Sequence, residues 1–225
     1  MLSDSSHQAF VISNQSEEIM KRREYKYKRQ DVNCKYCLRF IRGRCRETIC
    51  PWMNERIEAG VVEYKLLLRS FFLEHMHLQN RLKHLLGYAD QPLWKDEDHK
   101  RRFAHAQIIY GHFEERDTNA YYAALYLLTV DADLFSRMSK CFTKLRIDFR
   151  FTLLPGMSIK QYALYKAAKS LYTQSNDMKA DELADPELYD DEVFRLVINA
   201  ILISRYGKAL LSLNNEEETH GSISG

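Results

Sequence analysis

The sequence predicts a mainly α-helical protein, with a short cysteine-rich element near the N-terminus and a helical body after it. Three observations favour this fold class. The 225 residues include only 8 Gly and 4 Pro, which argues against a turn-rich β-sandwich or barrel. Apolar residues recur at helical spacing over long stretches of the chain. Four of the 5 cysteines fall within one short segment, which sets that segment apart from the rest.

The composition also limits the class of protein. With 45% hydrophobic and 28% charged residues, the chain can bury a substantial core. It contains no apolar run of about 18 residues, so we expect no transmembrane helix and no membrane partner. Residues 1–20 lack a basic stretch ahead of an apolar one, which argues against a secretory signal. We therefore expect a cytoplasmic protein.

Charge is divided unevenly along the chain, although the formal net charge is only +2. Within residues 21–46, eleven side chains are basic and two are acidic, whereas within residues 177–225 eleven are acidic and four are basic. Fields between exposed charges act over about 10 Å at cellular salt, so a local excess matters more than the total. We expect a flexible basic leader over residues 1–30 that attracts polyanions. We interpret the acidic end as a solvated face.

A cysteine-rich segment, here called the cysteine element (residues 31–54), follows the leader. Its cysteines have the spacing Cys34-x2-Cys37-x7-Cys45-x4-Cys50. Such clustering in a cytoplasmic protein is typical of a metal site rather than of disulfides, and four thiolates suit tetrahedral Zn²⁺. We predict that these four residues hold Zn²⁺ as a cofactor, which gives a zinc-binding element followed by a helical body. An iron–sulfur cluster and a redox Cys-x-x-Cys pair are the alternatives.

A long helix is predicted over residues 55–90. In its clearest part, apolar side chains alternate in steps of three and four, as in a packed helix or a short coiled coil. Flanking apolar residues widen this stripe, which favours burial in a helical body over a free coiled coil. A homodimer formed through residues 61–85 is the alternative. The stripe consists of Val61, Tyr64, Leu68, Phe71, His75, Leu78, Leu82 and Leu85.

A helical domain is predicted over residues 91–212, ahead of a tail at 213–225. Side chains able to cap a helix precede several of its apolar stretches. An imperfect alternation predicts one strand at 143–154, and residues 173–186 have the composition of a polar loop. The candidate caps are Asp96, Asp117 or Thr118, Asp131 and Ser158, and the expected helices are 97–113, 119–129, 131–140, 158–172 and 187–211.

The cysteine element also carries an aromatic and a glycine at fixed distances from its cysteines. Phe40 follows the second cysteine by three positions, and Gly43 precedes the third by two. Through this pattern residues 37–54 resemble the CCCH zinc-finger family. Asn54 stands where that family has its histidine ligand, and Cys34 would supply the missing thiolate. The resemblance implies binding of single-stranded RNA, with bases stacked on Tyr36, Phe40 and Trp52.

Two further local resemblances bear on function. The run over residues 50–60 and the segment from Trp94 onward are similar to uncharacterised proteins carried by mobile elements of Firmicutes, which imply no established activity. Within the long helix, Arg69-x5-His75 resembles the Arg-x4–6-His signature of HEPN ribonucleases. That resemblance implies a helical ribonuclease. The sequence contains no Ser-His-Asp, Walker, dinucleotide-binding or HExxH motif.

These observations together predict a non-enzymatic accessory protein that binds nucleic acid, with single-stranded RNA or DNA favoured. Basic side chains would neutralise phosphates, and aromatic side chains would stack on bases. The alternative is a protein–protein adaptor or an inhibitor of host machinery in which zinc is purely structural, and a HEPN-like ribonuclease comes third. The predicted nucleic-acid-binding residues are Arg22, Arg23, Lys26, Lys28, Arg29, Tyr36, Arg39, Phe40, Arg42, Arg44, Arg46 and Trp52.

Overall fold

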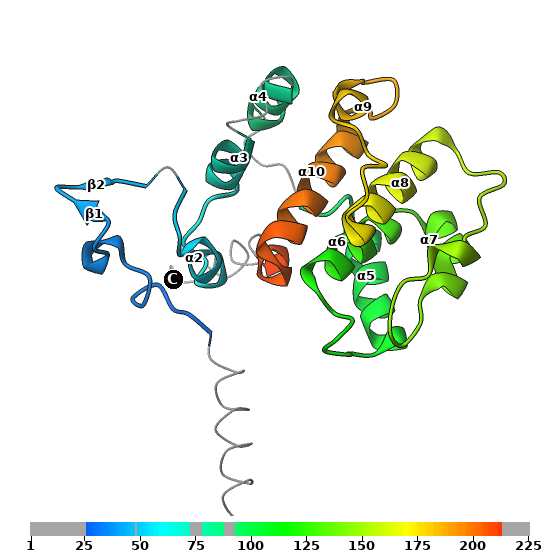
Figure 1. Cartoon of the computed structure of the whole chain (residues 1–225), viewed down its shortest axis with the longest axis horizontal. Helices are drawn as coiled ribbons and strands as arrows, with labels where there is room; N and C mark the ends of the chain where they lie inside the picture. The colour runs from blue at the N-terminus through cyan, green and yellow to red at the C-terminus, as the bar shows by residue number, and fades with distance from the viewer. Residues whose placement is uncertain (1–25, 48, 73–77, 88–92, 213–225) are drawn as a thin grey trace, which may run out of the picture.

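The computed structural model of the chain describes residues 26–47, 49–72, 78–87 and 93–212, and these residues are mainly helical (Figure 1). The predicted helical fold is therefore confirmed, whereas zinc binding by the cysteine element stays a prediction. Residues 1–25 of the predicted leader and the whole predicted tail, residues 213–225, lie outside the described residues. None of the helices described is both long enough and apolar enough to cross a bilayer.

One hairpin and a series of helices make up the fold. The hairpin pairs β1 (Phe40–Ile41) with β2 (Arg44–Cys45) in antiparallel fashion. The α-helices are α2 (Met53–Glu58), α3 (Tyr64–Phe72), α4 (Gln79–Gly87), α5 (Glu97–Tyr110), α6 (Asn119–Leu128), α7 (Ala132–Met138), α8 (Ile159–Thr173), α9 (Ala180–Ala184) and α10 (Asp191–Tyr206). Short 3₁₀ helices lie at Cys34–Tyr36, Ser139–Cys141, Phe149–Phe151 and Lys208–Ser212. The helices from α3 onward are called the body.

Helix α6 forms the axis of the body and packs against both α8 and α10 (Figure 1). Its sequence, NAYYAALYLL, is apolar on every side, and each side chain from Tyr121 to Leu128 is buried. A helix without a polar face is stable only where other elements surround it. Buried alanines on α6 and α8 let the helices approach closely. The hydrophobic core of the body therefore lies around α6.

Four predicted N-caps are confirmed. The side chains of Asp96, Thr118, Asp131 and Ser158 each accept a hydrogen bond from the backbone N–H three residues on, at the starts of α5, α6, α7 and α8. Each bond satisfies one of the backbone donors that the first turn of a helix leaves without a partner. Of the two candidates ahead of α6, Thr118 rather than Asp117 is the cap.

The structure differs from the single long helix predicted over residues 55–90. Helix α2 ends before residues 59–63, which are not helical. Gly60 has a φ of 64°, and its N–H and that of the next residue donate to carbonyls of the last turn, at 3.0 and 3.1 Å. This is a Schellman cap, which needs a left-handed residue and so favours glycine. The chain is helical again in α3 and α4, and residues 73–77 between them lie outside the described part.

Two segments of the body also differ from prediction. Within residues 143–154, Ile147 forms one isolated β-bridge with Phe142, and a 3₁₀ helix follows instead of a strand. Asp148 starts that 3₁₀ helix by accepting a hydrogen bond from the backbone N–H of Arg150 at 3.2 Å and also pairs with the Arg150 guanidinium, which favours a turn. Residues 173–186 contain α9, and the last helix starts later than predicted, after its cap at Asp190.

The apolar stripe of residues 61–85 belongs to the core of the body. Leu68, Leu78, Leu82 and Leu85 are buried, and they join the same hydrophobic cluster as α6 and α10. The described part of the stripe therefore covers the chain's own body, as the packed interpretation predicts. The homodimer through residues 61–85 stays a prediction.

A buried polar cluster joins α3, α5, α6 and α10. Nδ1 of His99 accepts a hydrogen bond from the backbone N–H of Lys95 at 3.2 Å, and Nε2 donates to the carbonyl of Tyr126 at 2.8 Å. On α10, Asn199 accepts a hydrogen bond from the hydroxyl of Tyr64 at 2.5 Å. Burial lowers the pKa of His99 to about 4, so the ring is neutral at neutral pH. The cluster is satisfied internally, and we assign it a structural role.

Candidate functional site

The cysteine element begins with one tight turn of backbone. Asn33 starts a 3₁₀ helix by accepting a hydrogen bond from the backbone N–H of Lys35 at 3.0 Å. The N–H of Cys37 then closes the turn on the carbonyl of Cys34, also at 3.0 Å. The first two cysteines therefore stand at the two ends of a single turn.

A hairpin follows that turn and carries the third cysteine. The chain reverses at Arg42 and Gly43, whose φ angles are 52° and 79°. Two successive positive φ angles are typical of a type I′ hairpin turn, and glycine adopts this conformation without steric cost. The reversal sets Cys45 opposite Phe40 in the two-residue pairing of β1 with β2.

Helix α2 attaches the cysteine element to the body. Its buried side chains, Met53 and Ile57, join the hydrophobic core, and Cys50 packs partly against the same core. Through this face α2 contacts α10 and the 3₁₀ helix Lys208–Ser212, and Figure 1 shows the hairpin on the far side of α2 from α10. The side of α2 that does not pack on the body lies toward the cysteine element.

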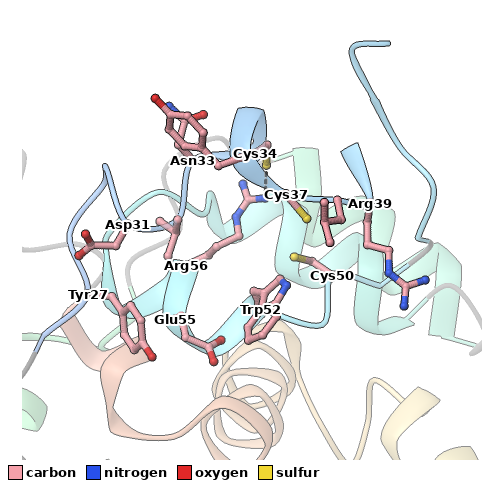
Figure 2. A pocket seen from close by; sticks show the side chains of 13 residues that line it. Tyr27, Asp31, Asn33, Cys34, Cys37, Arg39, Cys50, Trp52, Glu55 and Arg56 are labelled. Carbon is pink, nitrogen blue, oxygen red and sulfur yellow. Dashed lines mark hydrogen bonds between the residues drawn. The ribbon is translucent and has the colours of Figure 1, made fainter. Parts of the chain in front are cut away.

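Three of the four predicted metal ligands line one pocket. Cys34, Cys37 and Cys50 contribute to its wall, whereas Cys45 lies exposed on β2 outside it. All four are free thiols. On α2, Nη1 of Arg56 donates a hydrogen bond to Sγ of Cys34 at 3.0 Å (Figure 2). Across the described ranges, no three Cys, His, Asp or Glu side chains lie close enough together to hold a metal ion, so the ligand set as arranged is not a completed coordination sphere.

This pocket, here called the element pocket, has a volume of about 430 Å³ and an aromatic rim. Tyr36 is 83% exposed and Trp52 is 56% exposed, so both rings are accessible. Phe40, the third predicted stacking residue, is half-buried in the hairpin and does not line the pocket. Figure 2 shows the indole of Trp52 beneath Cys50, with the Arg56 side chain crossing the middle of the pocket. The polar side chains of the wall are Asp31, Asn33, Arg39, Glu55 and Arg56.

Exposed basic side chains lie on the hairpin and on the described end of the leader. Arg42, Arg44 and Arg46 are exposed on the hairpin, and none of the three forms an ion pair with another described residue. Arg39 is different, since Nη1 lies 2.7 Å from Oε1 of Glu47. Of the predicted leader residues, Lys26, Lys28 and Arg29 are exposed beside the element, whereas Arg22 and Arg23 lie outside the described residues. The hairpin arginines are thus available for an external anion.

The residues behind the ribonuclease alternative are not brought into a site that the structure describes. Arg69 is exposed on α3, and His75 lies outside the described residues. Elsewhere, Nδ1 of His112 lies 2.5 Å from Oδ2 of Asp117, an arrangement that can orient an imidazole. Asp117 also accepts from Nε of Arg116 at 2.7 Å and from a backbone N–H, so its contacts fasten the loop between α5 and α6. We assign this pair to structure.

Two pocket residues, Glu55 and Arg56, are not among the residues predicted from sequence. Their only signal is spacing, because they follow Trp52 by three and four positions on a helix and so lie on the same side as that ring. The prediction of a pocket there also requires knowing that α2 buries its other face.

Comparison of the chain with protein-family models, with curated proteins and with solved structures finds no match.

Proposed function

We propose that this protein binds single-stranded nucleic acid through the cysteine element, and that Zn²⁺ held by Cys34, Cys37, Cys45 and Cys50 stabilises that element. The observation that carries the proposal is the exposure of Tyr36 and Trp52 at the rim of a pocket bordered by arginines. Exposed aromatic side chains that adjoin a concave surface are common at binding sites.

The chemistry of the face suits a single strand better than a duplex. Each base offers a flat π-face only when it is unstacked, and stacking on an aromatic side chain is worth about 1–3 kcal/mol per base. Arg42, Arg44 and Arg46 would neutralise phosphates along the same strand. Stacking and charge neutralisation together give sequence-tolerant, salt-dependent binding.

Zinc in this proposal has a structural role. A small element that buries little apolar surface of its own gains folding free energy when it binds a metal, and the ligands come together as it does so. The free state of the four thiols and the N–H···S bond from Arg56 to Cys34 support this role. Zinc would supply only structural coordination, which would hold the backbone of the element in place.

Fluorescence anisotropy with labelled single-stranded RNA, single-stranded DNA and duplex DNA over a salt series tests the proposal. We expect single strands to bind in preference to duplex, with a Kd that rises steeply with salt. The Trp52→Ala and Tyr36→Ala variants should each weaken binding roughly tenfold, as expected from the loss of one stacking contact. Arg44→Gln should weaken binding to all strands alike and lower the salt slope by about one.

Phe151→Ala is the matched control, because Phe151 is an exposed aromatic of the body with 54% of its surface accessible. This variant should leave the Kd unchanged. An equal loss of nucleic-acid affinity in the Phe151→Ala and Trp52→Ala variants would rule out the cysteine element as the binding site. The proposal as a whole fails if metal-loaded protein binds none of the three nucleic acids at low salt.

A second candidate, a protein–protein adaptor, has one observation in its favour. Leu153, Ile159 and Tyr162 are exposed on the body, and Ile159 and Tyr162 line a pocket of about 150 Å³ between α8 and the end of α9. Apolar side chains gathered at a surface hollow are common in protein interfaces. An Ile159→Arg variant that retains full nucleic-acid binding would show that this surface and the cysteine element act separately.

A further inference from the structure

The element pocket contains a carboxylate beside its most accessible ring. Trp52 and Glu55 both line the pocket and lie three residues apart at the start of α2. The backbone N–H of Arg56 donates to the carbonyl of Trp52 at 3.1 Å, so helical geometry already holds at this turn. Side chains three apart on a helix share a side, and Figure 2 shows the Glu55 carboxylate next to the Trp52 indole.

The Glu55 carboxylate is not used by the protein itself. In the part of the chain that the structure describes, it makes no hydrogen bond or ion pair, and the residue is half-buried. The other charged side chains of the wall each make a contact: Nη1 of Arg56 bonds Cys34 although its buried Nε has no partner, Arg39 pairs with Glu47, and the Asp31 carboxylate accepts from a backbone N–H at 2.8 Å. Glu55 is therefore the pocket's open acceptor.

A carboxylate is out of place on a surface that binds phosphates, because it repels them. It is an acceptor only, so its natural partner is a group that presents N–H donors. Bases present such donors along the Watson–Crick edge when a single strand is splayed open on aromatic side chains. An open carboxylate next to an exposed indole thus fits a base in the pocket, with its ring on the indole and its edge on the carboxylate.

We propose that the element pocket binds an unstacked guanine, stacked on Trp52 and read by Glu55. Guanine is the one standard base whose Watson–Crick edge offers two adjacent donors, N1–H and the 2-amino group, which match the two carboxylate oxygens. Adenine and cytosine set an acceptor beside their amino group, and uracil sets its single N–H between two carbonyls. The inference rests on the proposed function and adds the base that the single strand must contain.

The test uses metal-loaded protein and short labelled RNA strands that are identical except for one central base. The strand with guanine should bind about tenfold more tightly than those with adenine, cytosine or uracil, the usual size of one bidentate base contact. Inosine lacks the 2-amino group and should lose most of this preference. 7-Deazaguanine keeps the Watson–Crick edge and should retain it.

The Glu55→Gln variant isolates the carboxylate. An amide offers one acceptor and one donor, so the variant should lose the guanine preference, while it binds the strands without guanine at least as tightly as wild type. Glu58→Gln removes the same charge from an exposed position on the same helix outside the pocket and should change nothing. Asp31→Asn removes a charge within the pocket and should keep the guanine preference.

Two outcomes distinguish this inference from the proposed function. Salt-dependent binding of all four strands with equal Kd would overturn the guanine assignment and leave single-strand binding in place. No binding of any strand at low salt would overturn both. A titration with free GMP, measured by the quenching of Trp52 fluorescence with Trp52→Phe as the control, shows whether the pocket binds a free nucleotide or a base within a strand. Binding of GMP as tight as that of the strand would overturn the assignment to nucleic acid.

Discussion

The cysteine element and the body use their side chains in opposite ways. In the body, α6 buries every side chain from Tyr121 to Leu128. In the cysteine element, Met53 at the start of α2 is buried, whereas Tyr36, Leu38 and Trp52 are exposed and the cysteines lie at or near the surface. A short segment cannot bury enough apolar surface to fold by itself. The body is therefore stabilised by its own core, and the element depends on its attachment to the body and, in our proposal, on the zinc that it binds.

The largest effect that we expect from this difference is on the free energy of unfolding, and one leucine from each region tests it. Leu125 is fully buried on α6, whereas Leu38 in the cysteine element is 93% exposed. Leu125→Ala should lower the free energy of unfolding by about 2–5 kcal/mol, because it removes buried methyl groups and leaves a cavity. Leu38→Ala should change it by less than about 0.5 kcal/mol. Urea denaturation followed by circular dichroism compares the two, and similar losses would contradict the division between element and body.

Acid should destabilise the body through His99. The pKa of this histidine is about 4 in the folded protein against 6.5 for a free side chain, because burial disfavours the charged ring. The unfolded chain therefore binds a proton below pH 6.5 that the folded chain does not, so the stabilisation present above that pH is lost as the pH falls toward 4. The loss is on the order of 3 kcal/mol.

Denaturation at a series of pH values measures this loss, with His99→Gln as the comparison. The variant should be less stable at pH 7 but should have a shallower dependence on pH between 6.5 and 4, since it lacks the titrating ring. Zinc stoichiometry of the variant at pH 7 should equal that of wild type. The same slope in both proteins would show that His99 does not carry the acid sensitivity.

A smaller effect is expected where the two regions meet, at Arg56. Its hydrogen bond to Sγ of Cys34 orients that predicted ligand, so Arg56→Gln should lower zinc affinity about tenfold, as is common for side chains that support a metal ligand. Arg39→Gln is the control, because Arg39 also lines the pocket but pairs with Glu47. Competition with a chelator measures both affinities, and equal affinities of the two variants would rule out a special role for Arg56.

The smallest effect is expected at the hairpin. Gly43 has a φ of 79° and nothing lies within 4 Å of the place where a Cβ would stand, so Gly43→Ala acts through backbone strain alone. The cost should be about 1 kcal/mol, confined to the cysteine element. Zinc affinity should fall severalfold, while the thermal midpoint of the body stays the same. A lowered midpoint of the body would indicate that the hairpin contributes to its stability.

The sequence predicts what depends on near neighbours and misses what depends on packing. The caps Asp96, Thr118, Asp131 and Ser158 are predictable because each bonds a backbone group three residues away. The end of α2 carried a local signal as well, in Gly60, but the apolar stripe that follows it dominates the interpretation. The strand expected at 143–154 was wrong because the alternation is imperfect and Asp148 forms a turn with Arg150 within it.

The residues of the candidate site also fall into two groups, those that local sequence predicts and those that depend on packing. Residue type and spacing single out the four cysteines, Tyr36 and Trp52 in advance. The pocket between them arises because α2 turns Met53 and Ile57 toward the body, and no local pattern in the cysteine element predicts that orientation. Glu55 and Arg56 face the pocket as a result of this packing. Their roles follow only once the two regions are placed together.

The two-sided character of α2 limits how the element can change in evolution or be transplanted. Met53 and Ile57 pack against the body, and Trp52, Glu55 and Arg56 line the pocket, all within six consecutive positions. A single inserted residue would rotate everything after it by about 100° and so turn the following side chains away from the surfaces that they contact. Insertions should therefore be tolerated in the hairpin but not between Trp52 and Ile57. A graft of the cysteine element onto another protein must bring α2, together with a surface that accepts Met53 and Ile57.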